Sequence, residues 1–175
     1  MAVALDLWET IAQEAADESQ LWAEALKPEP EREPVFSRLG EERYAVGLET
    51  IYEGYLLHYG RPRLFAPADA DTALLLGDYL YAHGLVRIAA TGSVGAVYDL
   101  AELISLCAQA RADGRPGEAD AWAATAALLG RGALDAARLE LSERGNGAAL
   151  LELAQAAAGE EAVERALVAH DLRVQ

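Results

Sequence analysis

The segment of residues 51–111 is the most informative part of the chain for its fold. It reads IYEGYLLHYGRPRLFAPADADTALLLGDYLYAHGLVRIAATGSVGAVYDLAELISLCAQAR. Residues 71–91 within it are apolar on almost every side, and their main polar interior positions are Asp78, His83 and Arg87. A helix of this kind is typical of the centre of a bundle, where neighbouring helices contact it on several sides.

A second helix follows this one after a very short connection. We expect Asp71 to cap the first helix, Gly92 to end it, and Ser93 to cap the next, which extends to about Ala112. A connection of so few residues places consecutive helices antiparallel. Residues 71–112 are therefore predicted to form a central helical hairpin.

The rest of the chain also shows apolar residues at helical spacing. Further helices are expected over residues 4–26, from 36 or 41 to 58, and over 118–129, 133–143, 148–157 and 160–172. No segment of strand length alternates between apolar and polar residues. The expected fold class is all-α, an antiparallel helical bundle of about six to eight helices.

These pieces fit a single helical domain over residues 1–175. An acidic N-terminal helix would cover residues 1–26, and a Pro/Glu linker residues 27–35, because three prolines cannot continue a helix. The central bundle would cover residues 36–113 and shorter C-terminal helices residues 117–175.

The composition is strongly acidic, with a formal net charge of −15. Negative charge repels nucleic-acid phosphates and anionic lipids, so we expect neither as a partner. The one cysteine, Cys107, excludes an internal disulfide and lies among apolar residues, which favours a core position. The sequence has no signal peptide and no stretch near the ~20 apolar residues of a membrane span, so we expect a cytoplasmic protein.

Two motifs resemble the trans-isoprenyl diphosphate synthases. Leu76-Gly77-Asp78-Tyr79-Leu80 is similar to the GDYL helix of that family, and Tyr59-Gly60-Arg61-Pro62-Arg63 lies where the family has RRGRP-like residues. The resemblance implies a terpenoid-synthase-like helical core. It also makes Arg61 and Arg63 candidate ligand-binding residues.

The residues that perform the chemistry of that family are missing from this sequence. The family binds magnesium and the allylic diphosphate through a DDxxD motif, and the matching segment, residues 50–55, has Glu53 as its one carboxylate. Departure of a diphosphate requires clustered carboxylates to hold Mg²⁺ against the leaving group. We therefore expect no catalytic residues, no metal site and no cofactor.

A family scaffold without its chemistry resembles the heptaprenyl diphosphate synthase component 1 group. This resemblance implies a regulatory subunit that pairs with a catalytic prenyl synthase, or a homodimer that binds an isoprenoid ligand. In that family the GDYL helix and the helix after it form the dimer interface. The corresponding interface positions here are Tyr79, Ala82, Leu85, Val86, Leu100 and Ile104.

The polar residues near these motifs have structural interpretations as well. Asp78 lies among apolar neighbours and needs a partner, so we interpret it as a buried tie between helices rather than a metal ligand. His83, one turn after Tyr79, is expected to hydrogen-bond within the bundle. Glu49 and Glu53 lie one turn apart and are interpreted as a solvated face.

Two other functions stay open at this point. One is a helical interaction or scaffold protein that is unrelated to isoprenoid metabolism. The other is a minimal active prenyltransferase, which would require a magnesium site that the sequence does not supply.

Overall fold

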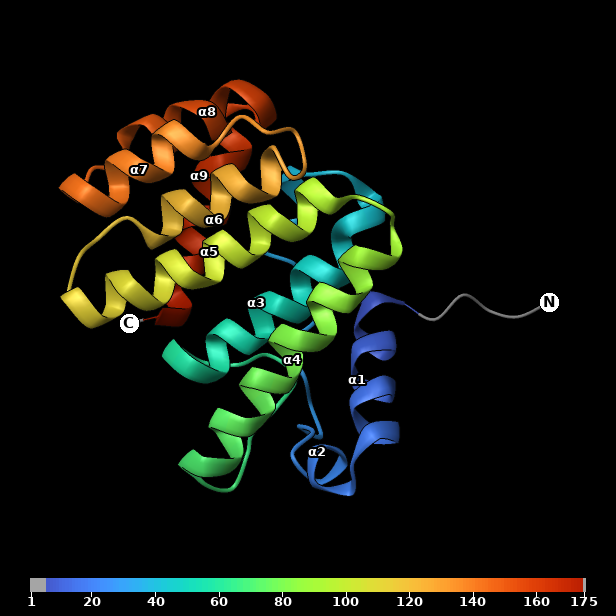
Figure 1. The fold of residues 1–175 in the computed structure, drawn as a ribbon. Helices are drawn as coiled ribbons and strands as arrows, with labels where there is room; N and C mark the ends of the chain where they lie inside the picture. The colour runs from blue at the N-terminus through green and yellow to red at the C-terminus, as the bar shows by residue number, and fades with distance from the viewer. Residues whose placement is uncertain (1–5, 175) are drawn as a thin grey trace.

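The computed structural model describes residues 6–174, and in this part of the chain the regular structure is helical (Figure 1). The helices are α1 (Leu7–Glu18), α2 (Gln20–Glu24), the 3-10 helices η1 (Ser37–Leu39) and η2 (Glu42–Tyr44), α3 (Ala45–Tyr59), α4 (Ala70–Ala90), α5 (Val94–Asp113), α6 (Glu118–Ala127), α7 (Asp135–Arg144), α8 (Ala148–Ala158) and α9 (Glu160–Val174). The all-α prediction is confirmed. The nine α-helices of the described residues exceed the predicted six to eight because the N-terminal helix is divided.

That division occurs at Ser19, which adopts an extended conformation with φ −154° and ψ 135°. Its hydroxyl accepts a hydrogen bond from the backbone N–H of Leu21 and so caps α2. The prediction of one continuous helix to residue 26 is therefore wrong. The predicted beginning, at residues 4 and 5, lies outside the described residues.

The central helix is α3 rather than α4. Every residue of α3 from Gly47 to Leu57 is buried. The prediction that α4 is contacted on several sides is wrong, because its buried residues form one face and Leu75 and Val86 on the opposite face are more than half exposed. Two 3-10 turns replace the expected first part of α3, which begins at Ala45.

Glycines allow α3 and α4 to approach closely along their lengths. A Cβ atom on Gly54 would lie 2.9 Å from the carbonyl oxygen of Gly77, and one on Gly84 would lie 3.1 Å from that of Gly47. The later glycine of α3 thus faces the earlier glycine of α4, so the two helices run antiparallel. Any larger side chain at these positions would separate the helices.

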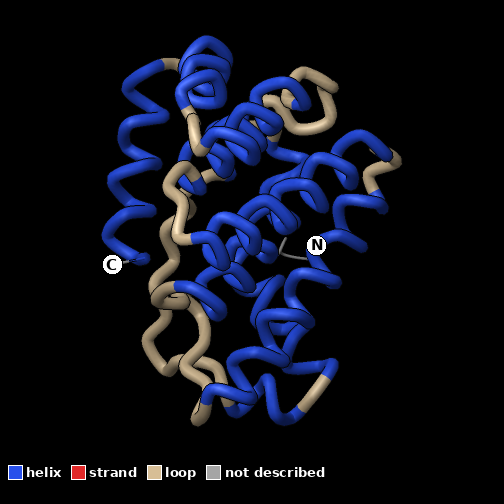
Figure 2. The backbone as a smooth tube through the Cα atoms, turned by 60° about the vertical axis from the view of Figure 1, so that its left-hand side comes forward, coloured by secondary structure: helices blue, strands red, loops and turns tan. Residues whose placement is uncertain are grey.

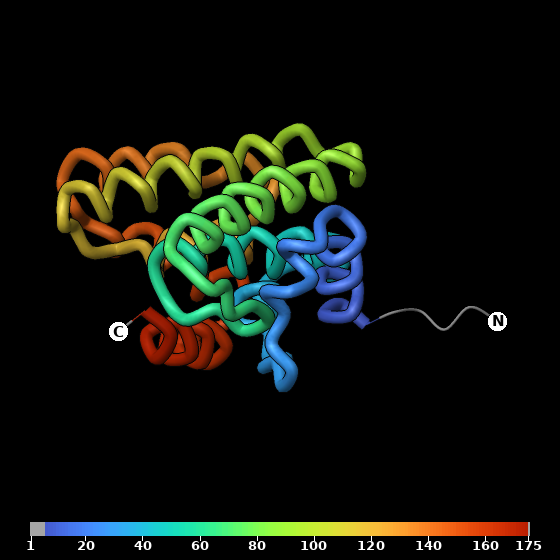
Figure 3. The backbone as a smooth tube through the Cα atoms, turned by 90° about the horizontal axis from the view of Figure 1, so that it is seen from below, coloured from blue at the N-terminus to red at the C-terminus, as the bar shows by residue number. Residues whose placement is uncertain are grey.

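The prediction that residues 71–112 form a central hairpin is therefore wrong, because its two helices, α4 and α5, do not pack along each other. Figures 1 and 3 show that α4 and α5 diverge from their shared turn, while α3 packs along α4. Ser93 caps α5 as expected, accepting from the Ala96 N–H at 3.2 Å. The cap of α4 is Asp69 and not Asp71, with the Thr72 N–H 2.7 Å from its carboxylate.

Residues 27–36, which we call the strap, cross from α2 to η1 beside the C-terminal half of α9 (Figure 2). The Lys27 N–H donates to the Leu64 carbonyl at 2.8 Å, and the Glu31 N–H donates to the Arg63 carbonyl at 3.1 Å. The predicted linker is thus a fixed segment, whose residues 28, 29 and 31–33 are exposed, whereas Val35 and Phe36 are buried in the core.

Two apolar clusters fill the interior of the described residues. The larger joins α3, α5, α6, α8 and α9 and contains Cys107, whose predicted core position is confirmed. The smaller joins α1 and α2 to α4 through Trp8, Trp22 and Leu76.

Candidate functional site

Three fully buried charged residues, Glu49, Glu53 and Arg63, form what we call the strap cluster. The Arg63 Nη1 atom lies 2.6 Å from Glu49 Oε2, and its Nε atom lies 3.0 Å from Glu53 Oε2. Both carboxylates project from α3, one turn apart, toward the loop that follows it. The prediction of a solvated face for the two glutamates is wrong.

Backbone groups satisfy the remaining carboxylate oxygens of this cluster. Glu49 Oε1 accepts from the N–H groups of Val35 and Ser37 at 3.2 and 3.0 Å, and Glu53 Oε1 accepts from the Leu64 N–H at 2.7 Å. Each of the four carboxylate oxygens therefore has a partner. The cluster binds the strap and the loop after α3 to the central helix.

The guanidinium of Arg63 is enclosed on its faces as well as its edges. Its Cζ atom lies 4.7 Å from the centre of the Trp8 ring and 4.9 Å from that of Tyr52. Burial acts to lower the pKa of Arg63, but the two carboxylates outweigh it and raise the pKa. The structure thus places the predicted site residues Glu53 and Arg63 in contact with each other. Their polar atoms are bonded within the protein and are not available to a ligand.

Arg61 lies apart from this cluster although it is only two residues from Arg63. Its side chain donates to the Leu172 carbonyl, and its N–H donates to the Arg173 carbonyl at 2.9 Å. Both acceptors are at the C-terminal end of α9, where a cation is favoured. The two arginines suggested by the family resemblance therefore act on different parts of the fold.

Asp78 lies on the surface, with 66% of its side chain exposed, and its partner is His58 Nε2 at 3.2 Å. The prediction that Asp78 forms a buried tie between helices is wrong, because Asp78 is on the outward face of α4. Its neighbours in sequence, Leu74 and Leu75, are exposed with it.

His83 connects α4 to α1. Its Nε2 atom lies 2.6 Å from Glu14 Oε2, and the same oxygen is paired with Arg87. Partial burial acts to raise the pKa of Glu14, but its bonds to His83 and Arg87 lower it. The hydrogen bond predicted for His83 is therefore present, with a partner outside the hairpin.

The predicted interface positions have different degrees of exposure. Val86 and Ala82 are exposed, whereas Tyr79 stacks on Trp22 with ring centres 5.9 Å apart. Leu85 and Ile104 are partly buried. Leu100 is fully buried in the larger core, so it offers no contact to a partner.

A second polar group, the arginine–tyrosine cluster, consists of Tyr55, Arg111 and Glu118 and was not predicted. Arg111 Nε lies 2.6 Å from Glu118 Oε2, and the Tyr55 hydroxyl lies within 3.2 Å of both partners. Burial raises the pKa of Glu118, whose Oε1 atom has no hydrogen-bond partner among the described residues. No spacing in the sequence relates these residues, because they come from α3, α5 and α6.

His170 of α9 lies inside the core, only four residues before the end of this helix. Its Nδ1 atom lies 3.0 Å from the Tyr52 hydroxyl, and its ring lies against Phe36, Tyr55 and Tyr52. Burial, with a further contribution from Arg111, lowers the pKa of His170 to about 4. The neutral ring thus joins α9 to α3.

Comparisons with protein-family models, with curated proteins and with solved structures find no match to this chain. Among residues 6–174, no three or more His, Cys, Asp or Glu side chains are arranged to hold a metal ion. In the same residues, no helix has both the length and the apolar character that a membrane crossing requires.

Proposed function

We propose that this chain is a non-catalytic helical subunit of the isoprenyl-diphosphate-synthase type, which acts through a helix–helix interface with itself or with a catalytic prenyl synthase. The strap cluster is the observation that carries this proposal. Where the resemblance expects a magnesium-binding carboxylate, Glu53 is fully bonded to Arg63 and to the Leu64 N–H. A carboxylate held in this way does not coordinate a metal unless the fold opens.

The outward face of α4 supports the second part of the proposal. Leu75 and Val86 are 56% and 65% exposed, and Ala82 lies between them on the same face. Val94, at the beginning of α5, is 83% exposed. Asp78 interrupts this face between Leu75 and Ala82, and exposed apolar residues grouped on one helix face are typical of surfaces that contact another protein.

The test is purification of the tagged full chain from its native cells, followed by native mass spectrometry of the product. We expect either a stoichiometric prenyl synthase or a homodimer. Val86→Asp should abolish that association, because it places a charge on the apolar face. Val168→Asp on α9 is the matched control, since Val168 is exposed to a similar extent and lies on another helix.

A monomer with no bound protein, unchanged by either substitution, would contradict the interface. Magnesium-dependent consumption of an allylic diphosphate by the purified chain would contradict the non-catalytic assignment.

The alternative is a helical scaffold protein unrelated to isoprenoid metabolism. The same exposed face of α4 supports it, since nothing in an apolar stripe selects a prenyl synthase over another helical partner. A stoichiometric partner that is not a prenyl synthase, lost in Val86→Asp and kept in Val168→Asp, would favour this alternative.

A further inference from the structure

A groove of about 390 Å³ runs between α5 and α7. Tyr98, Glu102 and Leu106 of α5 line one side, and Asp135 and Leu139 of α7 line the other. A smaller hollow shares Leu106 and continues along α5 as far as residue 113. Residues 98–113 of a helix span about 22 Å, so the groove has the length of roughly four helical turns.

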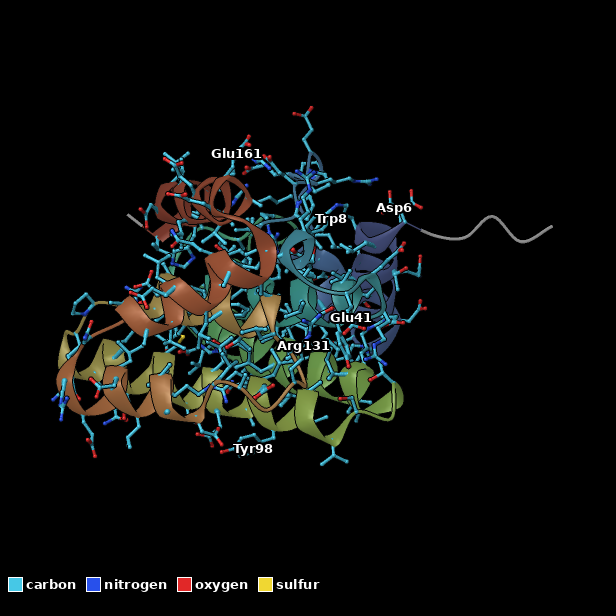
Figure 4. All side chains as sticks on the ribbon, turned by 90° about the horizontal axis from the view of Figure 1, so that it is seen from above. Asp6, Trp8, Glu41, Tyr98, Arg131 and Glu161 are labelled. Carbon is cyan, nitrogen blue, oxygen red and sulfur yellow. The ribbon has the colours of Figure 1, made fainter. Side chains whose placement is uncertain are left out.

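The apolar surface of this groove is open to solvent. Tyr98 is 50% exposed and Leu139 is 55% exposed, and Figure 4 shows the Tyr98 side chain at the outer edge of the molecule. Half-exposed large apolar side chains on both walls of one groove favour a ligand that covers them.

The charge of the groove is negative. The negative charges of Asp135, which has the larger effect, and of Glu102 both raise the pKa of the Tyr98 hydroxyl. Both carboxylates are therefore close enough to interact with the Tyr98 side chain. Arg138 lies 3.6 Å from Asp135, but its guanidinium is bound at 2.9 and 3.1 Å to the buried Asp99. The carboxylates of Glu102 and Asp135 therefore face the groove with little compensation.

We propose that this groove binds an amphipathic, basic α-helix of a partner protein. Leucine-like side chains of that helix would cover Leu106 and Leu139. A lysine or arginine would lie over the Tyr98 ring, between the carboxylates of Glu102 and Asp135. A second copy of this chain is disfavoured as the occupant, because it brings a formal charge of −15 to an acidic surface.

This inference goes beyond the proposed function and does not depend on it, since it uses the exposed surfaces of α5 and α7 that line the groove rather than the outward face of α4. The substitutions that test the two surfaces are different. Failure of one proposal therefore leaves the other standing.

The experiment measures binding of a fluorescent peptide of about 14 residues, about 21 Å long as a helix, to the full chain by anisotropy. The peptide carries leucines on one face and lysines along both edges. We expect Leu139→Gln to weaken binding about tenfold and the pair Glu102→Gln, Asp135→Asn to weaken it about threefold. Leu172→Gln and the pair Glu160→Gln, Glu164→Gln are matched controls on α9 and should bind as the unmodified chain does.

Three results would overturn the proposal. A peptide of the same composition in shuffled, non-amphipathic order could bind equally well. Spermidine could displace the peptide at an equal concentration of positive charge, so that charge alone is recognised. The α9 controls could weaken binding as much as the groove substitutions do. Circular dichroism of each variant separates loss of binding from loss of fold.

Discussion

The strap cluster and the arginine–tyrosine cluster both place an arginine between α3 and another part of the chain, yet they differ in burial and completeness. Arg63 is fully buried and its carboxylate partners have every oxygen bonded, whereas the side chain of Arg111 is 34% exposed and Glu118 keeps one unpaired oxygen. A buried charge persists only where its partners are complete. Glu53 and Arg63, which the sequence offered as candidate site residues, therefore form all their bonds within the fold and stabilise it.

Arg63→Met tests the strap cluster and should have the largest effect. It leaves two buried carboxylates without their cation, which we expect to reduce the free energy of unfolding by about 3–5 kcal/mol. Urea unfolding followed by circular dichroism measures this loss. Arg165→Met, at an exposed position of α9, is the matched control. Equal stability of the two variants would mean that the buried cluster contributes nothing.

Acidification tests the aromatic core that separates the two clusters. Because folding lowers the pKa of His170 from 6.5 to about 4, the unfolded chain binds the proton more tightly than the folded one. Stability should therefore fall as pH decreases from 6.5 to 4, by about 3 kcal/mol from this residue.

Urea unfolding at several pH values, compared with His170→Gln, isolates that contribution. The subtraction removes the opposing effect of Glu118, whose raised pKa makes acid stabilising. Parallel pH profiles of the two proteins would contradict the assignment of His170 to the core.

Arg111→Met tests the arginine–tyrosine cluster and should cost less than Arg63→Met. Glu118 would lose its cation, but it is partly solvated and can bind a proton, so we expect a loss of about 1–2 kcal/mol at neutral pH. The loss should shrink at acid pH. A double-mutant cycle with Glu118→Gln measures the coupling energy between Arg111 and Glu118. A loss of stability in Arg111→Met as large as that in Arg63→Met would contradict the difference between the two clusters.

Glu31→Gln removes the exposed partner that Arg173 finds on the strap, 3.0 Å away. Glu31 is 60% exposed, and such pairs contribute about 0–1 kcal/mol. The expected change in thermal midpoint is correspondingly small and should vanish at high salt. A loss comparable to that of Arg111→Met would show that exposure is a poor guide to these energies.

Part of the fold could be predicted because it depends on local signals. Prolines at positions 28, 30 and 34, the cap at Ser93 and the break at Gly92 mark helix ends through backbone restrictions that act within a few residues. The division at Ser19 was missed because a serine in an apolar-periodic segment is compatible with both a cap and a helix interior.

The candidate sites could be predicted much less well, since they depend on contacts between distant segments. Glu53 and Arg63 were selected for their place in a resemblance and do lie together, but Arg61 does not join them. Arg111 lies 56 residues after Tyr55 in the sequence, and Glu118 lies 63 residues after it. Helical periodicity cannot predict contacts between residues so far apart.

The helical and acidic character of this protein, and the places where most of its helices begin and end, follow from local features of the sequence, because propensity, capping and charge act locally or additively. Which helix is central depends instead on how the helices pack against one another. Glycines 47, 54, 77 and 84 bring α3 and α4 into close contact, which buries α3 and one face of α4 and leaves Leu75 and Val86 on the outward face of α4. The same packing encloses Glu49 and Glu53 around Arg63, and thereby makes two carboxylates part of the scaffold. Burial depends on which helix faces cover one another, and that is a property of the whole chain.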